Sequence, residues 1–169
     1  YIRRNTDPIA NIHLVPMGLS DQAGEATMYI EDLTGQNNTL LADFEEFSQH
    51  REDAFRSDVN YDSIDIQLDT LDAYVSRLEL RPGFVKIDVE GFEYEVLRGG
   101  CETLARYKPG VVVEVQRHYG PIFELMKQHG YLGFNQHQCR IDESVNVSQN
   151  LFFLHPEVHV ELLAELEKG

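Results

Sequence analysis

Two carboxylates stand where an apolar segment of the sequence ends. Asp88 and Glu90 close the run of residues 84–89, and Gly91 follows directly. Residues two apart on a strand point to the same face, so we expect both carboxylates to converge on one ligand. In open α/β sheets, ligands collect outside the carboxyl ends of the strands. The pair therefore lies where a reaction site is expected.

Two close carboxylates suit several kinds of chemistry. Their repulsion raises one pKa or recruits a cation, and their oxygens are suitable ligands for a divalent metal. They also bind hydroxyl groups or supply a general base. A structural alternative is that Glu90 caps the following helix, whose N-terminus favours negative charge. The spacing alone leaves these alternatives open, because acid-x-acid patterns are common.

A third acid, Glu114, interrupts the apolar run of residues 111–115. A charge in such a run is costly unless it is paired or belongs to a site. If this run lies beside residues 84–89 in a sheet, Glu114 comes close to Asp88 and Glu90. The alternative is a structural ion pair with a neighbouring cation, either Lys86 or Arg117.

Two further residues are candidates for substrate binding. Lys86 either neutralises the acids or extends its aliphatic chain along the sheet surface. His118 follows residues 111–115 on the expected ligand side, although a packing role would also explain it. No histidine or cysteine spacing forms a metal-ligand motif, and the phosphate-loop and serine-nucleophile motifs are absent from the sequence.

The composition excludes some partners. The 169 residues carry 14 basic and 29 acidic side chains, a net charge of −15. Such a surface repels phosphate backbones and anionic lipid, so we expect neither nucleic acid nor membrane as a partner. No apolar run approaches the ~20 residues of a membrane span. Two cysteines without a CxxC spacing fit a reduced, cytoplasmic setting.

The hydrophobic periodicity predicts strands and helices in alternation. The predicted strands are residues 12–15, 26–30, 64–68, 84–89, 111–115, 131–134 and 150–154. The predicted helices are residues 71–78, 92–98, 101–106, 121–129 and 156–168, with a break at Gly99-Gly100. Strand 64–68 alternates apolar and polar residues, which is typical of a half-buried strand near a sheet edge.

This pattern predicts one α/β domain over residues 1–169, with a mostly parallel sheet and helices on both faces. Strands 84–89 and 111–115 are apolar on both faces and suit the middle of such a sheet. Residues 31–63 are the least regular and form either a lid or a surface insertion. The tail helix, residues 156–168, packs on its own domain or on the partner in a homodimer.

Several segments together resemble the FkbM family of S-adenosylmethionine-dependent methyltransferases. The longest is residues 85–99 (VKIDVEGFEYEVLRG), which is similar to the family signature. Shorter segments on both sides of it also match, and all of them occur in the family's order. They are residues 15–21 (VPMGLSD), 68–72 (LDTLD), 111–114 (VVVE) and 150–153 (NLFF).

The resemblance implies a Rossmann-like class I methyltransferase fold that methylates a hydroxyl oxygen of a sugar or natural product. By position in the family, Leu19, Ser20 and Asp21 lie near the cofactor's adenine. Asp88 lies by the cofactor and the methyl-transfer centre. Glu90 and Glu114 bind or activate the acceptor hydroxyl, which must lose or share its proton as the methyl group moves.

The sequence departs from the family in two places. Gln116 stands where many relatives have a histidine, so a catalytic histidine is in doubt unless His118 substitutes for it. The family's first strand and its glycine-rich cofactor turn have no counterpart in this sequence. We therefore expect residues 1–169 to be the C-terminal two-thirds of the enzyme, with the N-terminal strands missing.

Two other functions remain as alternatives. One is a metal-dependent glycosyl or phosphoryl transferase that uses Asp88 and Glu90. The other is a non-catalytic remnant domain.

If the cofactor's main-chain cradle is absent, this chain binds S-adenosylhomocysteine weakly or not at all. Calorimetric titration measures this directly, and micromolar binding would contradict the expectation.

Overall fold

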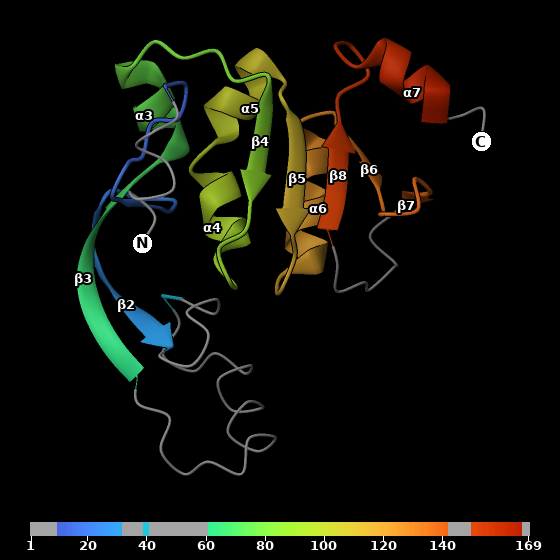
Figure 1. Cartoon of the computed structure of the whole chain (residues 1–169). Coiled ribbons are helices and arrows are strands. Elements are labelled where there is room, and N and C mark those ends of the chain that lie inside the picture. Colours follow the sequence, from blue (N-terminus) through green and yellow to red (C-terminus); the bar gives the residue numbers. More distant parts are fainter. Residues whose placement is uncertain (1–9, 32–38, 41–60, 142–149, 167–169) are drawn as a thin grey trace, which may run out of the picture.

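The computed structural model describes residues 10–31, 39–40, 61–141 and 150–166, which form an α/β fold (Figure 1). Most of the segment 31–63 lies outside the described residues, but Tyr61 to Ser63 belong to a strand. None of the described helices is long and apolar enough to cross a membrane.

The strands form two sheets. The first has the order β1-β3-β2, and its strands are β1 (Gly18–Leu19), β2 (Gly24–Glu31) and β3 (Tyr61–Asp69). The second has the order β4-β5-β8-β6-β7, and its strands are β4 (Phe84–Ile87), β5 (Gly110–Glu114), β6 (Leu132–Phe134), β7 (Arg140–Ile141) and β8 (Asn150–Leu154).

Both sheets are mixed. The pairs β1–β3 and β4–β5 are parallel, whereas β2–β3, β5–β8, β6–β8 and β6–β7 are antiparallel. The predicted α/β class is confirmed, but the prediction of a mostly parallel sheet is wrong for the described residues. Parallel neighbours need a long crossover, usually a helix. The helical segments at residues 93–98 and 101–107 provide such a crossover between the parallel strands β4 and β5, whereas β8 runs antiparallel to both of its neighbours, β5 and β6.

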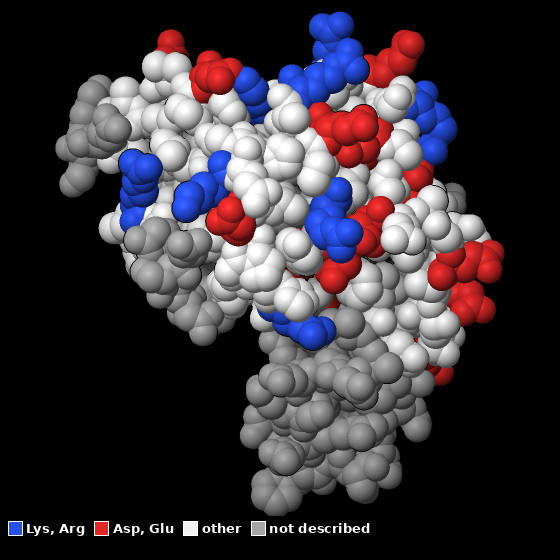
Figure 2. Space-filling model, turned by 180° about the vertical axis from the view of Figure 1, so that it is seen from behind, with Lys and Arg blue, Asp and Glu red and all other residues white. Residues whose placement is uncertain are grey.

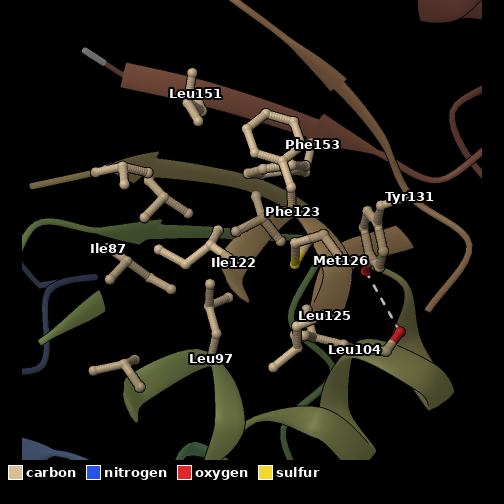
Figure 3. Close-up of a cluster of buried hydrophobic side chains, with 14 residues drawn as sticks. Ile87, Leu97, Leu104, Ile122, Phe123, Leu125, Met126, Tyr131, Leu151 and Phe153 are labelled. Atoms are coloured by element: carbon tan, nitrogen blue, oxygen red, sulfur yellow. Dashed lines mark hydrogen bonds between the residues drawn. The ribbon is translucent and has the colours of Figure 1, made fainter. Parts of the chain in front are cut away.

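One face of the five-stranded sheet carries the main core. It is covered by helices α4 (Glu93–Arg98), α5 (Cys101–Tyr107) and α6 (Tyr119–Gln128). Side chains such as Ile87, Leu151 and Phe153 from the strands meet Leu97 and Ile122 from the helices, all buried (Figure 3). Removing this apolar surface from water is the main stabilising contribution to the layer.

The opposite face of this sheet is partly open. Phe84 is 63% exposed, and β4 is the last strand of the sheet among the described residues. The prediction that this strand lies in the middle of a sheet is therefore wrong for this part of the chain. Helix α7 (Val160–Leu166) contributes Leu162 and Leu166 to a cavity of about 350 Å³ that Phe84 and Phe152 also line, so α7 and its own sheet form opposite walls of this cavity.

Some predicted positions of strands and helices change. Residues 12–15 form no strand, and the strand lies instead at Gly18–Leu19. Strand β3 pairs with β2 along its whole length but with β1 only at Leu68 and Asp69, so the predicted edge position is confirmed for residues 64–67 within the described part of the chain. The tail helix begins at Val160 rather than at residue 156, and residues 167–168 lie outside the described residues.

Helix α3 (Leu71–Arg77), which follows β3, is hydrogen-bonded to the helices that cover the second sheet. Thr70 caps α3 by accepting from the Ala73 N–H. The Asp72 carboxylate accepts from the N–H groups of Glu102 and Thr103 (2.9 and 2.7 Å) in the first turn of α5. These N–H groups have no partner within the helix, so Asp72 stabilises the start of α5.

The predicted helix break at Gly99-Gly100 is confirmed, and its cause is close packing. A β-carbon on Gly99 would collide with the backbone carbonyl oxygen of Ser20. One on Gly100 would lie 2.9 Å from a methyl carbon of Leu71. The two glycines therefore let the loop after β1 and the helix α3 approach the end of α4.

We predict that Gly99→Ala lowers the free energy of unfolding by about 1–3 kcal/mol, because the new methyl group meets backbone that cannot move aside cheaply. Urea denaturation of the variant measures this. Gly120→Ala in α6 is the matched control, since a β-carbon at that position would meet nothing within 4 Å. That variant is expected to gain about 0.5–1 kcal/mol, and an equal loss in both variants would contradict the packing explanation.

Candidate active site

A cluster of three charged side chains lies at the carboxyl ends of β4 and β5. The Lys86 Nζ atom is 3.1 Å from an Asp88 carboxylate oxygen and 3.7 Å from one of Glu114. In the parallel pair, Lys86 lies opposite Val112, so Asp88 and Glu114 follow side by side on the same face. The prediction that Glu114 lies near Asp88 is confirmed, and the ion pair predicted as its alternative also exists.

This cluster contributes little to stability. The side chains of Lys86, Asp88 and Glu114 are 41%, 48% and 38% exposed. Ion pairs this accessible to water contribute about 0–1 kcal/mol each. Two acids and one cation leave a net charge of −1 at a water-accessible edge. The cluster is therefore better suited to ligand recognition than to holding the fold together.

Glu90 occupies a different position from Asp88. Strand β4 ends at Ile87, and Glu90 (φ +48°) and Gly91 (φ +96°) form a left-handed turn. Strand alternation therefore does not extend to Glu90, and the expectation that both acids share one strand face is wrong. The Glu90 carboxylate accepts a hydrogen bond from Gln116 Nε2 (3.3 Å). The N-cap of α4 is Phe92, without a side-chain capping bond, so the capping alternative for Glu90 is not seen.

Glu93, which the sequence did not single out, is completely buried at the start of α4. Its carboxylate accepts from the N–H of Gly91 (2.7 Å) and from the N–H of Gln116 (3.4 Å). Burial raises the pKa of Glu93, while these backbone hydrogen bonds oppose the shift. In the sequence, Glu93 could have been found only as an acid two residues after the turn glycine. An acid there is also ordinary for the first turn of a helix, so the position did not stand out.

Gln116 is the second residue that the sequence did not assign. It follows β5, and it contacts Glu93 through its backbone N–H and Glu90 through its side chain. The resemblance placed a histidine here in many relatives. The resemblance therefore marked position 116 as part of the site, but nothing in the sequence predicted that an amide there would contact Glu90.

His118 lies two residues beyond Gln116, as the exposed N-cap of α6 with φ +60°. Its ring centroid is 5.7 Å from that of Tyr94 on α4. The structure thus brings His118 to the same loop as Gln116. Its substrate-binding role stays a prediction.

The three residues predicted to lie near the adenine are at the other end of α4. Ser20 donates its N–H to the Asp69 carbonyl (2.9 Å), and Asp21 pairs with Arg98 at the end of α4 (3.2 Å). Leu19 packs partly buried against the core. The six residues of α4 span about 9 Å, and the Glu90 turn lies at the start of this helix. The structure does not bring Leu19, Ser20 and Asp21 next to Asp88.

Within the described residues, no group of three or more histidine, cysteine or acidic side chains could hold a metal ion. The cation beside Asp88 and Glu114 is the Lys86 ammonium. On the helix-covered side of the molecule, basic and acidic side chains are interspersed, without a continuous basic surface (Figure 2). These observations give the metal-dependent transferase alternative no support.

Comparisons with known proteins point to one family. Residues 3–132 match the family model described as "Methyltransferase FkbM domain". Among solved structures, a similar chain is Methyltransferase FkbM from Methylobacillus flagellatus KT, with 14% sequence identity and a TM-score of 0.46. The match covers 90% of this chain and 31% of that chain. The search of curated proteins found no match.

We predict that Glu93 makes stability depend on pH. Because its pKa is raised in the folded state, the folded protein holds this proton more tightly than the unfolded chain does. Its contribution is therefore most favourable at low pH and is lost as the pH rises from the ordinary value of 4.5 through the raised value. Urea denaturation of the wild type and Glu93→Gln across this range measures the effect.

The Glu93→Gln side chain does not titrate, so the free-energy difference between the two proteins isolates Glu93 from the other acids. The free energy of unfolding of the wild type minus that of Glu93→Gln should fall as the pH rises. A difference that is constant with pH would contradict the prediction.

Proposed function

The chain belongs to the FkbM methyltransferase domain family, and from that membership we propose that it transfers a methyl group from S-adenosylmethionine to a hydroxyl oxygen of a sugar or natural product. The family match over residues 3–132 is the observation that carries this proposal. The same membership supports a Rossmann-like arrangement around the parallel pair β4–β5. The acids at the end of that pair fit the proposed chemistry.

The side chains at this edge suit the cofactor chemically. S-adenosylmethionine carries a sulfonium cation, an ammonium group and ribose hydroxyls, and when bound it supplies the methyl group. Asp88 and Glu114 are carboxylates that remain partly exposed, and Lys86 offsets only one of their two charges. We assign Asp88 to the cofactor side of the site. The adenine-side role of Leu19, Ser20 and Asp21 stays a prediction, because α4 separates them from the Glu90 turn.

The acceptor side is assigned to Glu90 and Glu114. A hydroxyl oxygen attacks well only if its proton is removed or strongly hydrogen-bonded in the transition state. A carboxylate oxygen of Glu90, held by Gln116 Nε2, is our candidate for receiving that proton. Glu114 hydrogen-bonds the acceptor, and Lys86 and His118 bind its other oxygen atoms. Holding the two reactants in a fixed geometry supplies much of the acceleration.

A methyl-transfer assay with the protein as its gene encodes it tests the proposal. With methyl-labelled S-adenosylmethionine and a panel of sugars and hydroxylated natural products, we expect label to appear in one acceptor class. Asp88→Asn and Glu114→Gln should each lower kcat by about 10²–10⁴-fold, the range typical of acid–base and positioning groups.

Glu102→Gln on α5 is the control, because it removes the same charge from an exposed helix position. It should keep the wild-type rate. Unchanged rates in the Asp88 and Glu114 variants would remove these residues from the site, and a failure to label any acceptor would count against the proposed function.

A further inference from the structure

The peptide bond between Glu90 and Gly91 is held at both of its polar ends by side chains. Its carbonyl oxygen accepts from Thr39 Oγ1 (2.6 Å), and its N–H donates to the Glu93 carboxylate (2.7 Å). Thr39 is 2% exposed and Glu93 is completely buried. Water therefore competes poorly for either hydrogen bond, and the plane of this peptide is fixed.

This peptide lies in a turn that a glutamate adopts reluctantly. Glu90 has φ +48°, in the left-handed region, where side chains other than glycine are disfavoured. A residue held there needs surrounding structure that prevents relaxation. The two hydrogen bonds supply this from opposite directions, because Thr39 is bonded to β2 through Tyr29 and Glu93 belongs to α4.

The second oxygen of Glu93 connects the turn to the neighbouring loop. It accepts from the Gln116 N–H, and the Gln116 side chain in turn donates to the Glu90 carboxylate. The buried Glu93 carboxylate thus accepts from the backbone N–H of Gly91, which follows Glu90 in the turn, and from that of Gln116, whose side chain contacts Glu90. A displacement of Glu93 would move both of them.

We propose that Glu93 and Thr39 are positioning residues that clamp the Glu90–Gly91 peptide and so present the Glu90 carboxylate, with Gln116 against it, to the acceptor. This inference rests on the proposed role of Glu90 in methyl transfer. Neither clamp residue needs to touch a substrate. Both act through Glu90.

Amide hydrogen exchange tests the clamp without reference to activity. In Glu93→Gln, one carboxylate oxygen becomes an NH₂ donor, so at least one of the Gly91 and Gln116 amides should exchange about tenfold faster or more. In Thr39→Val, which keeps the side-chain shape, the Gly91 amide should also exchange faster. The matched control is Thr103→Val, because Thr103 on α5 is equally buried at 2% exposure. Wild-type exchange at both amides in Glu93→Gln would overturn the clamp.

A double-mutant cycle on kcat tests whether the clamp residues act through Glu90. Glu93→Gln and Thr39→Val should each lower kcat by about tenfold or more in the wild type. In a Glu90→Gln background, neither should lower it further, since residues that act through one group are not additive. Equal losses in both backgrounds would show a merely structural role and overturn the inference.

The outcomes separate this inference from the proposed function. If the wild type transfers no methyl group, or Glu90→Gln keeps full activity, the proposed role of Glu90 fails, and amide exchange still decides whether the clamp exists. If Glu90→Gln lowers kcat but the cycle is additive, methyl transfer stands and the positioning role of Glu93 and Thr39 is wrong.

Discussion

The short helix α4 is held by close contacts at both of its ends, and these contacts determine how far apart the two loops at its ends lie. At its start, Glu93 is bonded to the loop after β5, and at its end Gly99 lies against the loop after β1. Neither end can shift without displacing one of these loops. The length of α4 therefore fixes the separation between the acidic edge of the five-stranded sheet and the Ser20 loop. That separation is set by the contacts at the two ends of α4, and a change in the length of a surface loop would not alter it.

Charge is used in two different ways around this helix. Lys86, Asp88 and Glu114 are exposed to water, so their mutual pairing adds little stability and leaves them accessible to a ligand. Glu93 is the opposite case, a buried acid whose desolvation cost is partly offset by backbone N–H donors. In a chain with net charge −15, the buried Glu93 carboxylate thus shapes the turn beside exposed acids.

Much of this arrangement could be predicted from the sequence, and the failures have physical causes. Apolar runs located β4, β5 and β8, and the glycine pair located the break after α4, because burial and chain flexibility are local properties. Strand direction was not local, so the antiparallel placement of β8 was missed. The placement of Asp88 and Glu114 around Lys86 followed from strand order, but Glu90 leaves the strand through a left-handed turn. Glu93 was missed because an acid in a first helical turn usually faces water.

The two groups of acids are held by different physics, and this supports different roles for them. Asp88 and Glu114 take their positions from strand register, beside a lysine that offsets their repulsion, which suits steady binding of hydroxyl or cationic groups. Glu90 takes its position from a left-handed turn that two buried side chains hold, with a neutral amide donating to its carboxylate. A turn of this kind persists only when its surroundings enforce it. Conservative substitutions of Thr39 and Glu93, which hold the turn, should therefore displace Glu90 more than changes of charge beside it.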